Sequence, residues 1–326
     1  MIEGLPCLIS LFVKHPFFES HFTMILRFFK TLCILATASL GTSMLPAQTP
    51  IDRDGLLIVA FGTSHQKALT SYTSTEKTLT TCFPADKTSW AYTSDIIRHK
   101  IAKEGRPVPS IQESLKMLSD KGVKTLCVQS LHMAAGEEFS QMERTIQRYL
   151  EHNPGAFEKV LIGRPLLESN RDMQEVVTAI LTEFPQERKA DEAIVLMGHG
   201  QKEGRADLVF AAVQTELHRK DPKAFLATVE GTTGFDSILA ELKKLQKQGL
   251  KTVWLAPFMI VAGDHATNDL AGDEEDSWAS VLKKEGFEVK LNLKGLGELQ
   301  GIRNVFLRHA RETTDNILVV KKGMKE

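Results

Sequence analysis

Short apolar runs alternate with longer amphipathic patterns from Gly55 to the end of the chain. Leu56–Phe61 (LLIVAF) and Ala193–Met197 (AIVLM) are the clearest of these runs, and each is too short for a buried helix. A continuous apolar run of this length is typical of a strand buried on both faces of a parallel sheet. Strands that alternate with helices of ten or more residues indicate βαβ units. The pattern therefore predicts an α/β fold with parallel sheets flanked by helices.

The individual elements can be placed from the same pattern. Strands are expected at 56–61, 90–93, 123–129, 159–163, 193–197, 226–230, 252–257 and 288–291. A long loop is expected between the strand that ends at 257 and a helix over 277–285, and a last helix is expected over 299–312.

Two segments of the chain are similar to each other without a gap. Residues 121–138 align with 248–265 at a constant offset of 127, with identities at Gly122/Gly249, Lys124/Lys251, Thr125/Thr252, Ala135/Ala262 and Gly136/Gly263. The opening strands match only weakly and at a different offset, which pairs Phe61 with His199 and Gly62 with Gly200. This period is longer than that of a solenoid repeat and indicates two similar domains. We expect Rossmann-like domains at 52–168 and 169–326 with a cleft between them, and a last helix able to pack back on the first domain.

The first 47 residues differ from the rest of the chain. Met24–Lys30 is short and basic, Thr31–Leu40 is apolar, and the small residue Ala47 follows soon after. A basic start, an apolar core of about ten residues and a small residue at the cleavage position are typical of a secretory signal peptide. The charged residues within 1–23 do not suit such a peptide, so translation is expected to begin at Met24. We expect a leader over 1–47 and an exported, periplasmic protein with no membrane span after cleavage; a retained anchor or a disordered tail is the competing interpretation.

The charge balance restricts the class of partner. The chain of 326 residues has 40 Lys and Arg against 41 Asp and Glu, a formal net charge of −1. This balance gives no support to a nucleic-acid-binding protein, which usually carries a basic surface. The 4 Cys are too few for a disulfide scaffold of this length. No disulfide is expected, and Cys127 is expected to be a packed core residue.

Polar residues gather at the expected carboxyl ends of the strands, where parallel α/β sheets bind ligands. The repeat makes Glu138 equivalent to His265, so pseudo-twofold symmetry would place them on opposite walls of one cleft with His199 between them. Two imidazoles and a carboxylate suit a divalent ion such as Co²⁺, Ni²⁺, Fe²⁺ or Zn²⁺. A histidine at a strand end can instead simply cap the next helix. The symmetric placement favours a metal site, with His132 and Asp264 as neighbouring or additional ligands.

Other motifs do not fit. The third glycine of a G-x-G-x-x-G dinucleotide motif would fall where Glu203 stands. The sequence has no G-x-x-x-x-G-K-[ST] phosphate loop, no C-x-x-C, no H-E-x-x-H and no G-x-S-x-G. The sequence therefore gives no indication of ATP.

Several segments together resemble the anaerobic-type sirohydrochlorin cobaltochelatases. They are VAFGTS (59–64), QSLH (129–132), GEE (136–138), MGHG (197–200), VAGDHATND (261–269) and DSW (276–278), within a similarity that runs from about Gly55 to His309. The resemblance implies the chelatase fold, with two similar α/β domains around a tetrapyrrole cleft. It implies insertion of Co²⁺ into sirohydrochlorin without ATP, on the anaerobic route to cobalamin. It also carries the metal-binding trio of the family onto Glu138, His199 and His265.

The resemblance and the chemistry suggest roles for individual residues. His199 and His265 would bind the incoming ion, Glu138 would complete the site, and His199 would accept a pyrrole proton. Backbone N–H groups at helix starts near Ser64 and Gly200 would meet the carboxylates of the substrate. The substrate-binding candidates are Ser64, His132, Gly200 and Asp264, with Lys202 and Arg205 as further candidate partners.

The leader leaves alternatives open, because most members of the resembled family lack one and cobalamin synthesis is cytoplasmic. One alternative is an exported haem- or metal-binding or transport protein on a chelatase fold, with His99 or His65 as an axial ligand. Another is ferrochelatase-like insertion of Fe²⁺. The sequence does not decide between Co²⁺, Fe²⁺ and Ni²⁺, since the same nitrogen and oxygen ligands bind all three. It is compatible with a homo-oligomer and does not decide that either.

Overall fold

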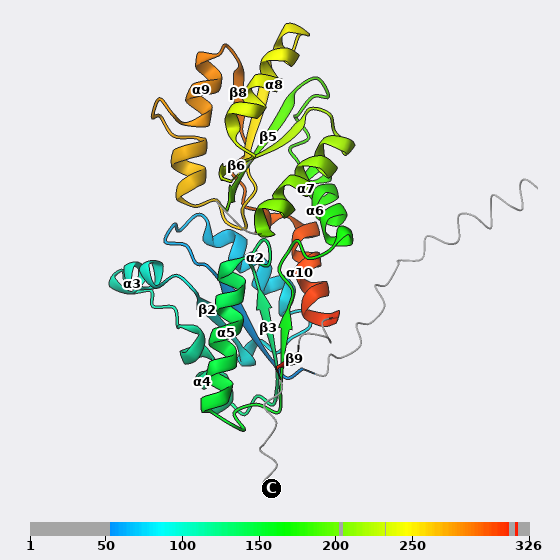
Figure 1. Ribbon diagram of the computed structural model, residues 1–326. Helices are drawn as coiled ribbons and strands as arrows, with labels where there is room; N and C mark the ends of the chain where they lie inside the picture. The colour runs from blue at the N-terminus through cyan, green and yellow to red at the C-terminus, as the bar shows by residue number, and fades with distance from the viewer. Residues whose placement is uncertain (1–52, 202–204, 232, 313–316, 319–326) are drawn as a thin grey trace, which may run out of the picture. The chain divides into compact units, whose positions relative to one another are not determined.

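Strands of the chain form two sheets (Figure 1). The structure, a computed structural model, describes residues 53–201, 205–231, 233–312 and 317–318. The first sheet has the order β2-β1-β3-β4-β9, with β9 antiparallel to β4 and the other pairs parallel. The second has the order β6-β5-β7-β8 and is parallel throughout. The strands are β1 (Gly55–Ala60), β2 (Thr88–Tyr92), β3 (Thr125–Ser130), β4 (Lys159–Gly163), β5 (Ala193–Gly200), β6 (Ala224–Glu230), β7 (Thr252–Pro257), β8 (Glu288–Leu291) and β9 (Ile317–Leu318).

The two sheets repeat one strand order, with the first strand of each half in second place. Leu56 of β1 pairs with Cys127 of β3, and Ile194 of β5 pairs with Trp254 of β7. Cys127 and Trp254 are equivalent at the offset of 127 that relates residues 121–138 to 248–265, so Leu56 is equivalent to Ile194. Five residues further on, Phe61 is therefore equivalent to His199. The register confirms the weaker match between the opening strands.

Burial explains why these runs form strands. All six residues of β1 and all six of β7 are buried. A parallel strand covered on both faces needs apolar residues at every position, because neither face meets water. Cys127 lies in β3 as a buried free thiol, as expected. The predicted α/β fold with parallel sheets flanked by helices is confirmed.

The helices begin at recognisable caps. The Ser94 hydroxyl accepts the Ile97 N–H, and Ser110 forms a capping box with Glu113. The α-helices are α2 (Leu69–Leu79), α3 (Asp95–Lys103), α4 (Ile111–Asp120), α5 (Glu137–His152), α6 (Asn170–Thr182), α7 (Arg205–Lys220), α8 (Phe235–Lys247), α9 (Trp278–Lys284) and α10 (Gln300–Glu312). Short 3₁₀ turns lie at Ala85–Lys87 (η1) and Leu296–Glu298 (η3).

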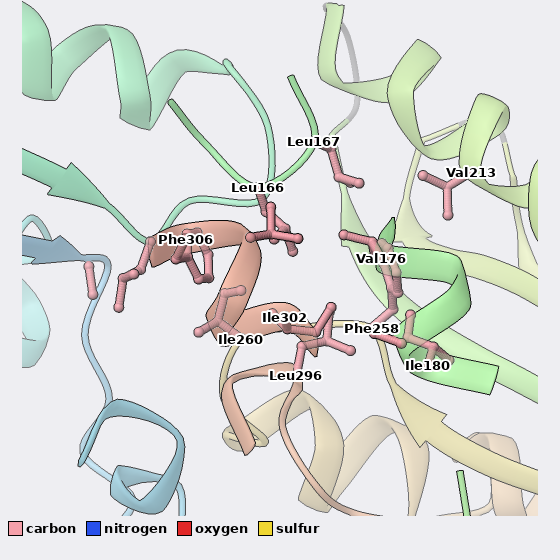
Figure 2. Packing of buried hydrophobic residues seen from close by; sticks show 14 of the residues in the cluster. Leu166, Leu167, Val176, Ile180, Val213, Phe258, Ile260, Leu296, Ile302 and Phe306 are labelled. Atoms are coloured by element: carbon pink, nitrogen blue, oxygen red, sulfur yellow. The ribbon is translucent and has the colours of Figure 1, made fainter. Parts of the chain in front are cut away.

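One apolar cluster is shared by elements of both sheets. It includes Leu56 of β1, Ile194 of β5 and Phe306 of α10. Figure 2 shows part of it, where Ile302 and Phe306 of α10 lie among residues of α6, of η3 and of the segments after β4 and β7. Helix α10 packs against α2, β3 and β4 as well as α6. Separate clusters cover the outer face of each sheet. The shared core supports the carboxyl ends of β1 and β5, where polar residues follow.

The structure differs from the sequence expectations at several places, including strand ends that shift by two or three residues at β3, β5 and β6. A π-helical turn, η2 (Ala266–Leu270), lies within the segment that was expected to be a loop. The strand β2 begins two residues before the expected position 90, and the short strand β9 was not expected. Among the described residues, no helix is long and apolar enough to cross a membrane. The leader over 1–47 lies outside the described residues, and the domain boundary at 168/169 stays a prediction.

Candidate functional site

The expected ligands sit where two strands of the second sheet end. His199 is the next-to-last residue of β5 and is exposed. His265 lies after β7 and directly before the turn η2. A π-helical turn is rare and is often found at functional sites, because it re-aims side chains within a helical segment. The local geometry therefore brings both side chains to the carboxyl edge of the sheet.

The imidazoles of His199 and His265 are neighbours. Their ring centroids are 4.9 Å apart and the rings meet edge to face, at 79°. This is the one pair of the expected trio that the structure brings into direct contact. Within the described residues, no group of three or more His, Cys, Asp or Glu side chains forms a preassembled metal site. The role of Glu138 as third ligand therefore stays a prediction.

The partners of the two rings assign their tautomers. Nδ1 of His265 lies 2.5 Å from Oδ2 of Asp269, one turn further along the chain. Nδ1 of His199 lies 3.1 Å from the carbonyl oxygen of Gly200. A carbonyl oxygen and an ionised carboxylate only accept, so Nδ1 carries the proton in each neutral ring. Nε2 of each ring is then the basic nitrogen, able to bind a metal ion or take up a proton.

Glu138 and His132 lie in the half of the chain that forms the first sheet. Glu138 is exposed in the first turn of α5, and its charge acts on His132 at the end of β3. Nδ1 of His132 lies 2.7 Å from the Ser130 hydroxyl, and its ring meets Phe139 edge to face. Its Nε2 is buried with no hydrogen-bond partner. Burial lowers the pKa of His132 to about 4, against the opposing effect of Glu138. His132 is therefore a neutral imidazole near neutral pH.

An acidic residue that the sequence analysis did not single out lies opposite the residue that follows His199. In the second sheet Glu230, the last residue of β6, pairs with Gly200 of β5. The equivalence of the two halves places Glu230 at the position of Ser94, just after β2. The strand end carries no histidine that would mark it in the sequence. The signal that was available is the repeat itself, which aligns the end of β6 with the residues after β2.

The remaining substrate-binding candidates lie at or after the ends of β1, β5 and β7. Gly200 has φ of +77°, and a Cβ there would lie 1.8 Å from the Glu230 carbonyl oxygen. Ser64 follows β1, and its carbonyl oxygen accepts a hydrogen bond from Arg106 at 3.4 Å. Asp264 contacts His65, with 2.5 Å between Oδ1 and Nε2. Lys202 lies outside the described residues, as does the side chain of Arg205.

Fold and site together define a chelatase-type α/β protein, with a duplicated parallel sheet and paired imidazoles at the strand ends. The model of the family described as cobalt chelatase (CbiK) matches residues 54–315. This match covers well over half of the chain, and the chain belongs to this family.

Two curated relatives extend the similarity over most of the sequence. Sirohydrochlorin cobaltochelatase CbiKC of Nitratidesulfovibrio vulgaris is 32% identical over 268 residues, which cover 82% of this chain and 93% of the relative. Sirohydrochlorin cobaltochelatase of Salmonella typhimurium is 30% identical over 262 residues, which cover 80% of this chain and 96% of the relative. The similarity therefore includes both halves of the fold.

Solved structures share the fold at lower identity. SirB from Bacillus subtilis with Fe³⁺ superposes with a TM-score of 0.56 and 16% identity, covering 81% of this chain and 96% of SirB. The sirohydrochlorin chelatase SirB from Bacillus subtilis subspecies spizizenii, in complex with cobalt, gives 0.55 and 14%, with the same coverage. At these identities the likeness confirms the chelatase-like fold.

Proposed function

We infer that this chain is a sirohydrochlorin cobaltochelatase, which inserts Co²⁺ into sirohydrochlorin without ATP on the anaerobic route to cobalamin. The observation that carries the inference is the contact between His199 and His265 at the strand ends of a chain in the cobalt chelatase family. Both named relatives are sirohydrochlorin cobaltochelatases.

Metalation exchanges two pyrrole N–H protons for one divalent ion, so the protein must present the ion and receive protons. His199 and His265 would bind Co²⁺ through Nε2, which their Nδ1 partners leave unprotonated. As the ion transfers to the macrocycle, a released imidazole nitrogen is free to accept a proton. His199 is exposed at the strand end and would take the first pyrrole proton. Asp269 keeps His265 oriented while this occurs.

A carboxylate would complete the metal site and pass protons onward. Glu138 is our candidate, since the repeat makes it the counterpart of His265. Glu230 is the competing candidate, since it ends β6 opposite Gly200, the residue after His199. Ser64, Gly200, Asp264 and His132 would surround the substrate at the same edge, where backbone N–H groups can meet its carboxylates.

A metalation assay tests the proposed function. The purified chain is mixed with sirohydrochlorin and Co²⁺, Fe²⁺ or Ni²⁺, and the change in tetrapyrrole absorption gives the rate for each ion. We expect Co²⁺ to be inserted, and His199→Ala or His265→Ala to lower kcat/KM at least about a hundredfold, since each removes a ligand or a base. His152→Ala is the matched control, because His152 is exposed at the end of α5 and its Nδ1 contacts the carbonyl oxygen of Arg148 in the same helix. Normal turnover by His199→Ala would refute the mechanism.

Export and haem binding are proposals of a different kind. The leader pattern over 1–47 supports export to the periplasm, and N-terminal sequencing of the secreted chain tests it. An intact Met24 segment in the mature protein would refute cleavage.

A haem-binding protein would show a Soret band as isolated, whereas the enzyme would turn over sirohydrochlorin with Co²⁺. Size-exclusion chromatography with light scattering would decide whether the chain forms a homo-oligomer.

A further inference from the structure

A contact joins the segment that follows β1 of the first sheet to the segment that follows β7 of the second sheet. His65 lies after β1 of the first sheet, and Asp264 lies after β7 of the second. Nε2 of His65 is 2.5 Å from Oδ1 of Asp264, across 199 residues of sequence. The side chains are 34% and 66% exposed. A short contact between two partly exposed groups needs both backbones to be held in place, since a flexible pair in water gains little.

The His65 side of the contact is anchored in the first half. Thr63 is buried, and its hydroxyl accepts the N–H of His65 at 3.1 Å. The N–H of Gly62 donates to the Tyr72 hydroxyl at 3.3 Å, and Gly62 has φ of +108° with Tyr92 packed against it. His65 is therefore presented from a turn whose backbone is fixed by the core of the first sheet.

On the other side of the contact, Asp264 directly precedes His265, a proposed metal ligand. The carbonyl oxygen of Gly263 accepts the N–H groups of Ala266 and Thr267, each at 3.1 Å. The carbonyl oxygen of Asp264 accepts the Thr267 hydroxyl at 3.1 Å. His265 therefore follows Asp264 within a turn that these hydrogen bonds hold in place. A restraint on the Asp264 side chain limits the rotation of that turn, and with it the direction of the His265 ring.

We propose that His65 is a positioning residue for cobalt insertion: by holding Asp264 it fixes the turn that carries His265 against the first half. The proposal rests on the metal site proposed above. It does not make His65 a ligand. It assigns to the His65–Asp264 contact the task of keeping the two imidazoles at their observed separation before the ion arrives. Preorganised ligands bind an ion more tightly because no ordering is required at the moment of binding.

The test measures binding of Co²⁺ alone to the full chain, by titration followed through the visible absorption of protein-bound Co²⁺. We expect His65→Ala to weaken binding by about tenfold, in the range known for residues that orient metal ligands. His65→Gln keeps an N–H donor and should restore most of the affinity. In the metalation assay His65→Ala should lower kcat more than it raises KM for sirohydrochlorin. His152→Ala should leave binding unchanged, because His152 is exposed at the end of α5, and circular dichroism should show every variant folded.

A double-mutant cycle identifies the pathway of the effect. If His65 acts through Asp264, His65→Ala combined with Asp264→Ala should weaken Co²⁺ binding no more than the stronger single change does. Additive losses of Co²⁺ affinity in the double variant would overturn the proposal. Failure of His65→Gln to restore affinity would also overturn it, by indicating that His65 binds the ion itself. A gain in kcat or a fall in KM for His65→Ala would also overturn it, since the contact would then obstruct substrate access. Failure of the metal site is distinguishable, because His199→Ala and His265→Ala would then bind Co²⁺ normally.

Discussion

His265 Nδ1 and Asp269 Oδ2 are 2.5 Å apart within one turn, so the carboxylate of Asp269 fixes the tautomer of an imidazole that also touches His199. Such a carboxylate orients the ring and raises the basicity of its other nitrogen. Both histidines of the site are held in this way by an acceptor close in sequence, Gly200 for His199 and Asp269 for His265. Hydrogen bonds within the chain therefore set which nitrogen of each ring is basic.

Asp269→Asn should weaken Co²⁺ binding by about tenfold and slow metalation, because the amide loses the charge that makes His265 a better ligand. Asp273→Asn is the matched control, since Asp273 is an exposed carboxylate a few residues further on. Isothermal titration with Co²⁺ and the steady-state rate check the prediction. Equal affinities for the two variants would mean that Asp269 has no part in ligand orientation.

The two candidate carboxylates can be separated in the same assay. We expect Glu138→Gln to weaken Co²⁺ binding by about tenfold, because a neutral amide is a poor substitute for a carboxylate ligand. Glu230→Gln is the comparison, since Glu230 pairs with Gly200, the neighbour of His199 in β5. If Glu230→Gln gives the larger loss and Glu138→Gln gives none, the third ligand comes from β6. A loss of kcat with unchanged Co²⁺ affinity would instead identify the residue that takes protons onward.

Local sequence patterns were enough to find the strands and the two histidines. Leu56–Phe61 and Ala193–Met197 are buried strands because both faces of a parallel sheet need apolar residues, and strand ends flanked by glycine mark His199. The repeat at offset 127 then anticipates the equal strand order of the sheets. These features depend on short segments, whose preferences are visible in the residues themselves.

Other features depend on how separate segments meet, which periodicity does not encode. The position of Glu138 relative to the histidines is set by packing between the halves, and Glu230 becomes notable only through the β5–β6 register. The contact of His65 with Asp264 spans 199 residues and has no sequence signal. The π-helical turn after His265 was missed because five residues are too few to show a helical period.

His132 should make the fold less stable in mild acid. Burial lowers its pKa from the ordinary 6.5 to about 4, so between these values the unfolded chain binds a proton that the folded chain does not. Stability is therefore complete above the unfolded pKa and decreases as the pH falls from about 6.5 toward 4. At pH 5 the loss from this one group should be at most about 2 kcal/mol.

Urea unfolding of wild type and His132→Gln at pH 7.5 and pH 5.0 measures this effect. The stability difference between the two pH values should shrink in His132→Gln. In His152→Gln it should stay as in wild type, because His152 is exposed at the end of α5. An unchanged pH dependence in His132→Gln would show that His132 titrates normally in the folded chain.

Alanine substitutions at Gly200 and Gly122 distinguish the cost of backbone strain from the cost of close packing beside His199. Their φ values are +77° and +74°, so alanine would be strained about equally at both, by about 1 kcal/mol. At Gly122 a Cβ would meet nothing within 4 Å, whereas at Gly200 it would lie 1.8 Å from the Glu230 carbonyl oxygen. Gly200→Ala must therefore force β5 and β6 apart at the strand end that carries His199.

We expect Gly122→Ala to lower the free energy of unfolding by about 1 kcal/mol and to leave Co²⁺ binding unchanged. Gly200→Ala should lower the free energy of unfolding by about 3 kcal/mol or more, and should weaken Co²⁺ binding as well, because His199 moves with the strand. Urea unfolding and Co²⁺ titration of the two variants measure both quantities. Equal losses of stability with intact binding would show that Gly200 is needed only for its backbone angle, and that the approach of β6 does not position His199.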